Sequence, residues 1–188
     1  GGGEVEPMNL RGIACAGRLD WESSGLLIFT QNGSLARLIV GENAEMEKEY
    51  LVRVRSDGSS QIATRRDWEL VLKRLRHGLW LDGQALKPAN VSIAKSSDAA
   101  LLPGAQHGWE VGSTVLCVIL REGMKRQIRR MCYIVGLDVV QLHRIRIGGL
   151  SLRGNADEEA LPIGKWRTFE EGELVQFTQP TKRTVKRF

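Results

Sequence analysis

The sequence of 188 residues lacks long apolar runs, paired cysteines and clustered histidines. No stretch approaches about eighteen consecutive apolar residues and no cationic, apolar leader is present, so we expect neither a membrane span nor a secretory signal in these residues. The three cysteines form no Cys-x-x-Cys pair, and the three histidines are equally scattered. This pattern excludes a disulfide framework and a zinc site. It predicts free thiols in a reducing compartment, a bacterial cytoplasm or an organelle such as a plastid or mitochondrion.

Aromatic residues are also few, at 6% of the chain, which argues against a long stacking platform for single-stranded nucleic acid. Strands and helices do not alternate regularly, so a doubly wound parallel sheet is not expected. A hydrophobic content of 42% is enough to bury a core in one domain or in two closely joined halves. We expect Trp21, Trp80 and Trp166 to pack in that core.

Hydrophobic periodicity predicts the main elements of the fold. The predicted elements are helices over 34–40 and 64–77, strands over 26–30, 48–54, 113–120 and 138–147, short strands between 79 and 95, and a surface loop over 96–112. In the last long strand, alternation places Arg144 and Arg146 on one face and Ile145 and Ile147 on the other.

Positive charge is concentrated in the second half of the chain. The net charge is +5, but residues 121–153 alone carry eight Lys or Arg against two acids. An apolar stripe from Met124 to Val135 predicts a helix opened by Gly123 and closed by Gly136, with several cations in its first turns. Each cation at that end of the helix dipole costs about 0.3 to 1 kcal/mol, so we expect these side chains to face an anion such as phosphate. An ordinary solvated face remains the alternative.

One carboxylate near the start of the chain is a candidate reactive group. Asp20 follows Arg18 and stands just before an apolar strand that ends at Asn32-Gly33. The arginine can hold a neighbouring carboxylate ionised, and the strand gives the preceding loop a rigid support. Asp20 is therefore a candidate nucleophile. The alternative is that it turns the chain and that Arg18 is its surface partner.

Several short motifs together resemble a known enzyme family. They are Gly17-Arg18-Leu19-Asp20, Ser24-Gly25-Leu26-Leu27, Lys48-Glu49-Tyr50-Leu51-Val52, Glu122-Gly123, Arg126-Gln127-Ile128-Arg129-Arg130-Met131 and Gly164-Lys165-Trp166-Arg167. In this order they resemble the RsuA/RluB/RluE/RluF family of ribosomal RNA pseudouridine synthases, with wording nearest to its RluF branch. The resemblance runs from about residue 11 to about residue 175. The main departure beside Asp20 is Cys15-Ala16, where the family usually has Pro-Val.

The resemblance implies an α+β pseudouridine synthase fold, with a mixed, mostly antiparallel sheet, flanking helices and a central cleft. It implies a catalytic domain over 11–177 in two closely joined halves, between a disordered segment over 1–10 and a basic tail over 178–188. The small RNA-binding domain that usually precedes this domain in the family is not part of the sequence.

The resemblance also assigns roles to individual residues. Asp20 matches the catalytic aspartate, Tyr50 the tyrosine that lies against the target uracil, and Arg129 the basic residue that pairs with the aspartate. Because burial disfavours an isolated charge, we expect Asp20 and Arg129 to form a buried ion pair. The residues assigned to the RNA substrate are Arg18, Lys48, Lys125, Arg126, Ile128, Arg130, Arg144 and Arg146.

The implied activity is the isomerisation of a specific uridine to pseudouridine in RNA, most simply in large-subunit ribosomal RNA. The reaction gains and loses no atoms and has no net redox change, so we expect no cofactor and no metal. We expect a monomer that acts on RNA without a membrane. Two alternatives stay open. One is a catalytically idle RNA-binding or ribosome-assembly module, and the other is a glycosidic hydrolase with Asp20 and Glu22 as its carboxylate pair.

Overall fold

The computed structural model describes residues 10–41, 45–58, 64–109, 111–152, 161–169 and 172–173. The predicted segment over 1–10, except for its last residue, and the predicted tail over 178–188 lie outside the described residues. Within the described part of the chain, no helix is long and apolar enough to cross a membrane.

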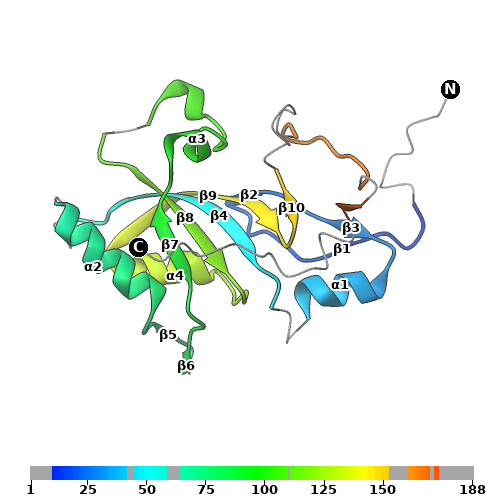
Figure 1. The fold of residues 1–188 in the computed structure, drawn as a ribbon, viewed down its shortest axis with the longest axis horizontal. Helices are drawn as coiled ribbons and strands as arrows, with labels where there is room; N and C mark the ends of the chain where they lie inside the picture. The colour runs from blue at the N-terminus through cyan, green and yellow to red at the C-terminus, as the bar shows by residue number, and fades with distance from the viewer. Residues whose placement is uncertain are drawn as a thin grey trace.

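A mixed sheet forms the centre of the described structure (Figure 1). Its strands are β2 (Ser23–Gly25), β4 (Lys48–Ser56), β7 (Asn90–Ile93), β8 (Thr114–Leu120), β9 (Leu137–Ile147) and β10 (Leu150–Ser151). The strands β10-β9-β4-β8-β7 pair antiparallel in that order, and β2 pairs with β9 in parallel. The sheet is therefore mixed and mostly antiparallel, as predicted.

Two helices cover one face of the sheet. Helix α2 (Arg65–Arg76) begins with a capping box, in which Thr64 and Asp67 each accept a hydrogen bond from the other's backbone N–H. Its apolar side and that of α4 (Gln127–Ile134) pack into one core with strands β4 and β8. The hairpin of β5 (Trp80–Leu81) and β6 (Gln84–Ala85) connects α2 to β7. The predicted helix over 64–77 is confirmed.

The opposite face is covered by the segment that was predicted to be a surface loop. It contains helix α3 (Ser96–Ala99) and a 3-10 helix over Ala105–His107, and α3 lies across the sheet from α4 (Figure 1). Leu102 is fully buried against Leu51, Val115 and Ile145. The loop prediction is therefore wrong, because one buried leucine anchors this aperiodic segment to the sheet.

The N-terminal part of the described chain packs at the β10 end of the sheet. It consists of β1 (Ala14–Cys15), β3 (Phe29–Thr30) and α1 (Gly33–Val40), and the Asn32 side chain caps the helix. Its small core joins α1 to the residues around β10. The helix over 34–40 is confirmed. The predicted strand over 26–30 is too long, since only its last two residues belong to β3.

Three tryptophans do not pack as predicted. Trp21, Trp80 and Trp166 are 100%, 63% and 41% exposed. The buried hydrophobic core consists almost entirely of aliphatic side chains, and these three rings lie outside it.

Candidate active site

A cleft of about 890 Å3 opens where the N-terminal loop meets the sheet and the start of α4. It is lined by Asp20 from that loop, by Lys48 and Tyr50 from β4, and by Leu142 and Arg144 from β9. Its volume lies within the range of about 300 to 1,000 Å3 that is typical of small-molecule sites. The structure therefore brings together residues that are more than a hundred positions apart in the sequence.

Eight of the eleven predicted site residues line this cleft. They are Arg18, Asp20, Lys48, Tyr50, Lys125, Arg126, Ile128 and Arg144. Arg129, Arg130 and Arg146 do not line it.

The loop that carries Asp20 is fixed to β9 by backbone pairing. Ser23 N–H donates to the Asp20 carbonyl at 2.9 Å and begins β2, which runs beside β9. Gly25 has φ +116°, and a Cβ at this position would lie 2.2 Å from the carbonyl oxygen of Arg144. Only glycine allows this approach of the two backbones. Gly25 belongs to the motif that resembles the family, and its role is to let this junction close.

A buried histidine at this junction predicts a pH-dependent stability. His143 is hydrogen-bonded to the Ser24 hydroxyl at 2.8 Å, and burial lowers the pKa of its imidazole below the ordinary 6.5. The unfolded chain therefore takes up this proton at a higher pH than the folded chain does. We expect the free energy of unfolding to fall as pH drops below about 6.5, with a slope below the one-proton limit of about 1.4 kcal/mol per pH unit.

Urea unfolding between pH 7.5 and pH 5 measures this effect in wild type, His143→Gln and His107→Gln. His107 is exposed, so its variant serves as the matched control. A His143→Gln variant that loses stability with falling pH as steeply as wild type would contradict the assignment.

Arg144 is the central cation of the cleft. Its buried guanidinium donates from Nε to the Leu26 carbonyl at 2.9 Å and from Nη1 to the Arg18 carbonyl at 3.4 Å. It therefore holds the chain on both sides of Asp20. Its Nη2 is buried and has no hydrogen-bond partner among the described residues.

The electrostatics of the cleft favour an anion and a neutral tyrosine. Burial raises the pKa of the Tyr50 hydroxyl, the charge of Arg144 opposes that rise, and the charge of Asp20 adds to it. Burial and the charge of Arg144 both lower the pKa of Lys48. Tyr50 is thus a protonated hydroxyl at neutral pH. Lys48 and Arg144 are two positive charges in the same cleft, and a bound phosphate or carboxylate would reduce the repulsion between them.

The predicted Asp20–Arg129 ion pair is not formed among the described residues. Arg129 donates from Nη2 to the Glu22 carbonyl at 2.8 Å and from Nη1 to the Val139 carbonyl at 3.2 Å, and its Nε lies 3.7 Å from the Glu22 carboxylate. Arg129 therefore holds the loop at Glu22, two residues after Asp20, and does not line the cleft itself. Glu22, expected only as an alternative catalytic acid, is instead the partner of this arginine.

The basic helix begins later than predicted. Helix α4 starts at Gln127, and Arg126 before it has a left-handed backbone with φ +52°. Lys125 and Arg126 therefore lie in a turn that lines the cleft, not in the first turn of the helix. Arg130 does not line the cleft. It forms a bidentate ion pair with Asp82 of the β5–β6 turn, at 2.6 and 2.8 Å.

Arg146 lies on the face of the sheet away from the cleft. A register shift between Glu49 and Tyr50 pairs them with Arg146 and Arg144, so that β9 carries one extra residue. Since neighbouring residues of β4 point to opposite faces, Arg144 accompanies Tyr50 toward the cleft and Arg146 accompanies Glu49 away from it. The prediction that both arginines share one face and bind substrate is wrong for Arg146, because simple alternation misses the bulge.

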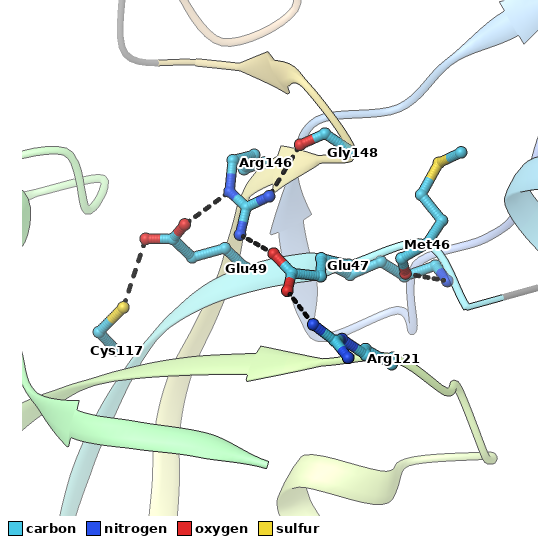
Figure 2. Close-up of polar contacts among 8 residues, drawn as sticks. Met46, Glu47, Glu49, Cys117, Arg121, Arg146 and Gly148 are labelled. Carbon is cyan, nitrogen blue, oxygen red and sulfur yellow. Dashed lines mark hydrogen bonds and ion pairs between the residues drawn. The ribbon is translucent and has the colours of Figure 1, made fainter. Parts of the chain in front are cut away.

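Figure 2 shows the buried network around Arg146. The guanidinium donates to the Glu49 carboxylate at 2.7 Å, to the Glu47 carboxylate at 3.1 Å and to the Gly148 carbonyl at 2.7 Å. On the outside of the network, the Cys117 thiol donates to Glu49 and Arg121 donates to Glu47. Each of the three guanidinium nitrogens donates to the protein itself, so this group is part of the buried network and not of the cleft lining.

Comparison with known proteins identifies the family. The model of the family described as RNA pseudouridylate synthase matches residues 5–133. The chain belongs to this family. The match contains Asp20, Tyr50 and Arg129 but ends before Arg144, so the central cation of this pseudouridylate synthase domain lies outside it.

Similar proteins carry matching names. The chain is 32% identical over 160 residues to an uncharacterised RNA pseudouridine synthase of Aquifex aeolicus, covering 85% of this chain and 53% of that one. It is 30% identical over 159 residues to the dual-specificity RNA pseudouridine synthase RluF of Escherichia coli, covering 85% and 44%. It is 30% identical over 158 residues to the ribosomal large subunit pseudouridine synthase B of Pseudomonas aeruginosa, covering 84% and 34%. The chain thus spans between a third and about half of the length of these relatives.

Solved structures share the fold of this chain. A crystal structure of a pseudouridylate synthase aligns with a TM-score of 0.61 at 23% identity, covering 88% of this chain and 60% of that one. An H/ACA RNP bound to a substrate RNA aligns with a TM-score of 0.56 at 18% identity, covering 77% and 41%. The predicted pseudouridine synthase fold is confirmed.

Among the described residues, no group of three or more His, Cys, Asp or Glu could hold a metal ion.

Proposed function

We propose that this protein isomerises a specific uridine to pseudouridine in ribosomal RNA, most simply in the large subunit, and that it acts as a monomer without a cofactor. The observation that carries the proposal is the shared cleft of Asp20, Tyr50 and Arg144 in a chain of the pseudouridylate synthase family. The names of the RluF and synthase B relatives support ribosomal RNA as the substrate class.

Asp20 is the nucleophile in this proposal. The reaction breaks the bond between C1′ and N1, turns the base and joins C1′ to C5. The C5 proton leaves to solvent or to a base, and N1 takes up one proton, so the product is an isomer of the substrate. A carboxylate can attack the sugar or the ring, and either route gives a covalent intermediate that is released in the second half of the reaction. Arg144 supplies the opposing positive charge, since its guanidinium group spans both sides of the Asp20 loop.

Tyr50 holds the target base. A uridine inside a helix is out of reach, so it must be flipped out at a cost of a few kcal/mol. Stacking on one aromatic ring is worth about 1 to 3 kcal/mol, which is comparable to that cost. Ile128 adds an apolar wall to the same cleft, and Lys48, two residues before Tyr50 on β4, lines the cleft and can meet a phosphate or carbonyl oxygen.

The RNA backbone binds to the cations at the mouth of the cleft. Arg18, Lys125 and Arg126 line it, and Lys125 and Arg126 are exposed. Phosphate contacts of this kind release counterions, so the affinity for RNA should fall steeply as salt rises. Arg129 acts in this proposal as a positioning residue, because it holds the loop and does not line the cleft.

The glycosidic hydrolase is the weaker reading. A hydrogen bond from Arg126 and the charges of Arg126 and Arg129 hold the pKa of Glu22 below its ordinary range. A carboxyl held in its charged form is a poor proton donor to a leaving base at neutral pH. Glu22 also does not line the cleft, so it is not placed as the partner of Asp20.

Transcripts of bacterial ribosomal RNA made with uridine tritiated at C5 test the proposal. Release of tritium with an equal yield of pseudouridine is the expected result. Free uracil in the products would instead favour the hydrolase. RNA that binds at low salt but releases no tritium from any ribosomal fragment would favour the idle RNA-binding module and overturn the enzyme.

A further inference from the structure

Trp21 occupies an unusual place beside the cleft. It is fully exposed and directly follows Asp20. The hydrogen bond from Ser23 N–H to the Asp20 carbonyl, at 2.9 Å, closes a turn in which Trp21 and Glu22 are the two central residues. Asp20 and Ser23 line the cleft, so the turn between them carries the fully exposed Trp21 directly beside it.

The turn that presents this indole is held on both sides. The Glu22 carboxylate accepts a hydrogen bond from Arg126 at 2.8 Å, and its carbonyl accepts one from Arg129 at 2.8 Å. On the other side, Ser23 begins β2 and pairs with β9. The backbone of Trp21 is therefore fixed before any ligand arrives, which lowers the entropic cost of using its side chain for binding.

A single exposed aromatic residue is common on protein surfaces and carries no argument by itself. The placement of this one does. A uridine that flips into the cleft leaves the neighbouring base with one uncovered face. An indole on this turn, which Arg126 holds beside the cleft, can cover that face while the exposed Lys125 in the cleft lining meets an adjoining phosphate.

We infer that Trp21 is a stacking platform for a nucleotide adjacent to the target uridine. The inference rests on the proposed function, since it takes Asp20 to mark the place of the target. It adds a contact outside the cleft that would favour substrates with a strongly stacking neighbour, because purines stack better than pyrimidines.

Short RNA probes test the platform directly. A nine-nucleotide single strand carries one uridine at its centre and 2-aminopurine on its 5′ side or, in a second probe, on its 3′ side. Wild type is expected to quench the 2-aminopurine of one probe on binding. Trp21→Ala should abolish the quenching and weaken binding about 5- to 50-fold.

Trp166→Ala is the matched control, since this tryptophan is also exposed and does not line the cleft. It should bind within about twofold of wild type. A third probe has an abasic site at the position where 2-aminopurine is quenched. Trp21→Ala and wild type should bind this probe with the same affinity. Trp21→Ala that binds the base-containing probes like wild type would overturn the inference. So would an equal loss in Trp166→Ala, or wild type that binds none of the probes.

Tritium release separates this inference from the proposed function. With an active wild type, Trp21→Ala should raise KM more than it lowers kcat, and its thermal unfolding should match wild type because the side chain is fully exposed. Wild type without tritium release would count against the enzyme. An active wild type and a Trp21→Ala variant with unchanged KM would count against the platform alone.

Discussion

Replacing Asp20 with asparagine is expected to lower the rate of pseudouridine formation by about 1,000-fold or more. The amide has nearly the same size as the carboxylate but is not a nucleophile, so the cleft keeps its shape and loses its reactive group. RNA binding should persist, because the change removes a negative charge from a surface that binds phosphate. Single-turnover tritium release measures the first effect, and filter binding at fixed salt measures the second.

Glu22→Gln is the matched control for this variant. It changes another carboxylate of the same turn, but one that does not line the cleft and is paired with Arg126. We expect its rate to stay within about tenfold of wild type, since it loosens the loop without removing the nucleophile. An Asp20→Asn enzyme that kept more than a tenth of the wild-type rate would end the role assigned to Asp20.

The larger elements of the fold could be predicted from the sequence because their patterns are local. The alternation in β4 and the capped, amphipathic α2 depend on neighbouring residues and were placed to within about two residues. The segment over 96–112 was not predictable in the same way. Its single buried leucine has no periodicity, and only the sheet beneath it makes Leu102 part of the core.

The site was predicted less completely, for reasons that lie in the backbone. The residues that motif resemblance singles out, Asp20 and Tyr50, do line the cleft, but no pattern reveals the left-handed Arg126 that starts α4 late. Likewise, one extra residue in β9 turns Arg144 into the cleft and Arg146 away from it. Such shifts of register are set by pairing with a distant strand. A single sequence does not report them.

The buried pair of Glu49 and Arg146 gives the largest expected effect on stability. The two side chains are 1% and 7% exposed, and their closest atoms are 2.7 Å apart. Removing one partner leaves a buried charge uncompensated, so Arg146→Met is expected to lower the free energy of unfolding by about 3 to 5 kcal/mol. Urea unfolding measures the loss. Arg65→Ala removes an exposed ion pair with Glu69 and should change stability by less than about 1 kcal/mol.

Replacing both Glu49 and Arg146 tests separately how the pair affects stability and how it affects activity. Buried ion pairs exchanged for apolar residues of similar volume often regain most of the lost stability, so Glu49→Met with Arg146→Met should be clearly more stable than Arg146→Met alone. Its activity should not recover in proportion. The pair lies directly beside the register shift that precedes Arg144, so we expect its loss to displace Arg144, and a displacement of about 1 Å there can cost up to about 100-fold in rate. A double variant that regained stability and full tritium release together would show that the bulge holds its register without the ion pair.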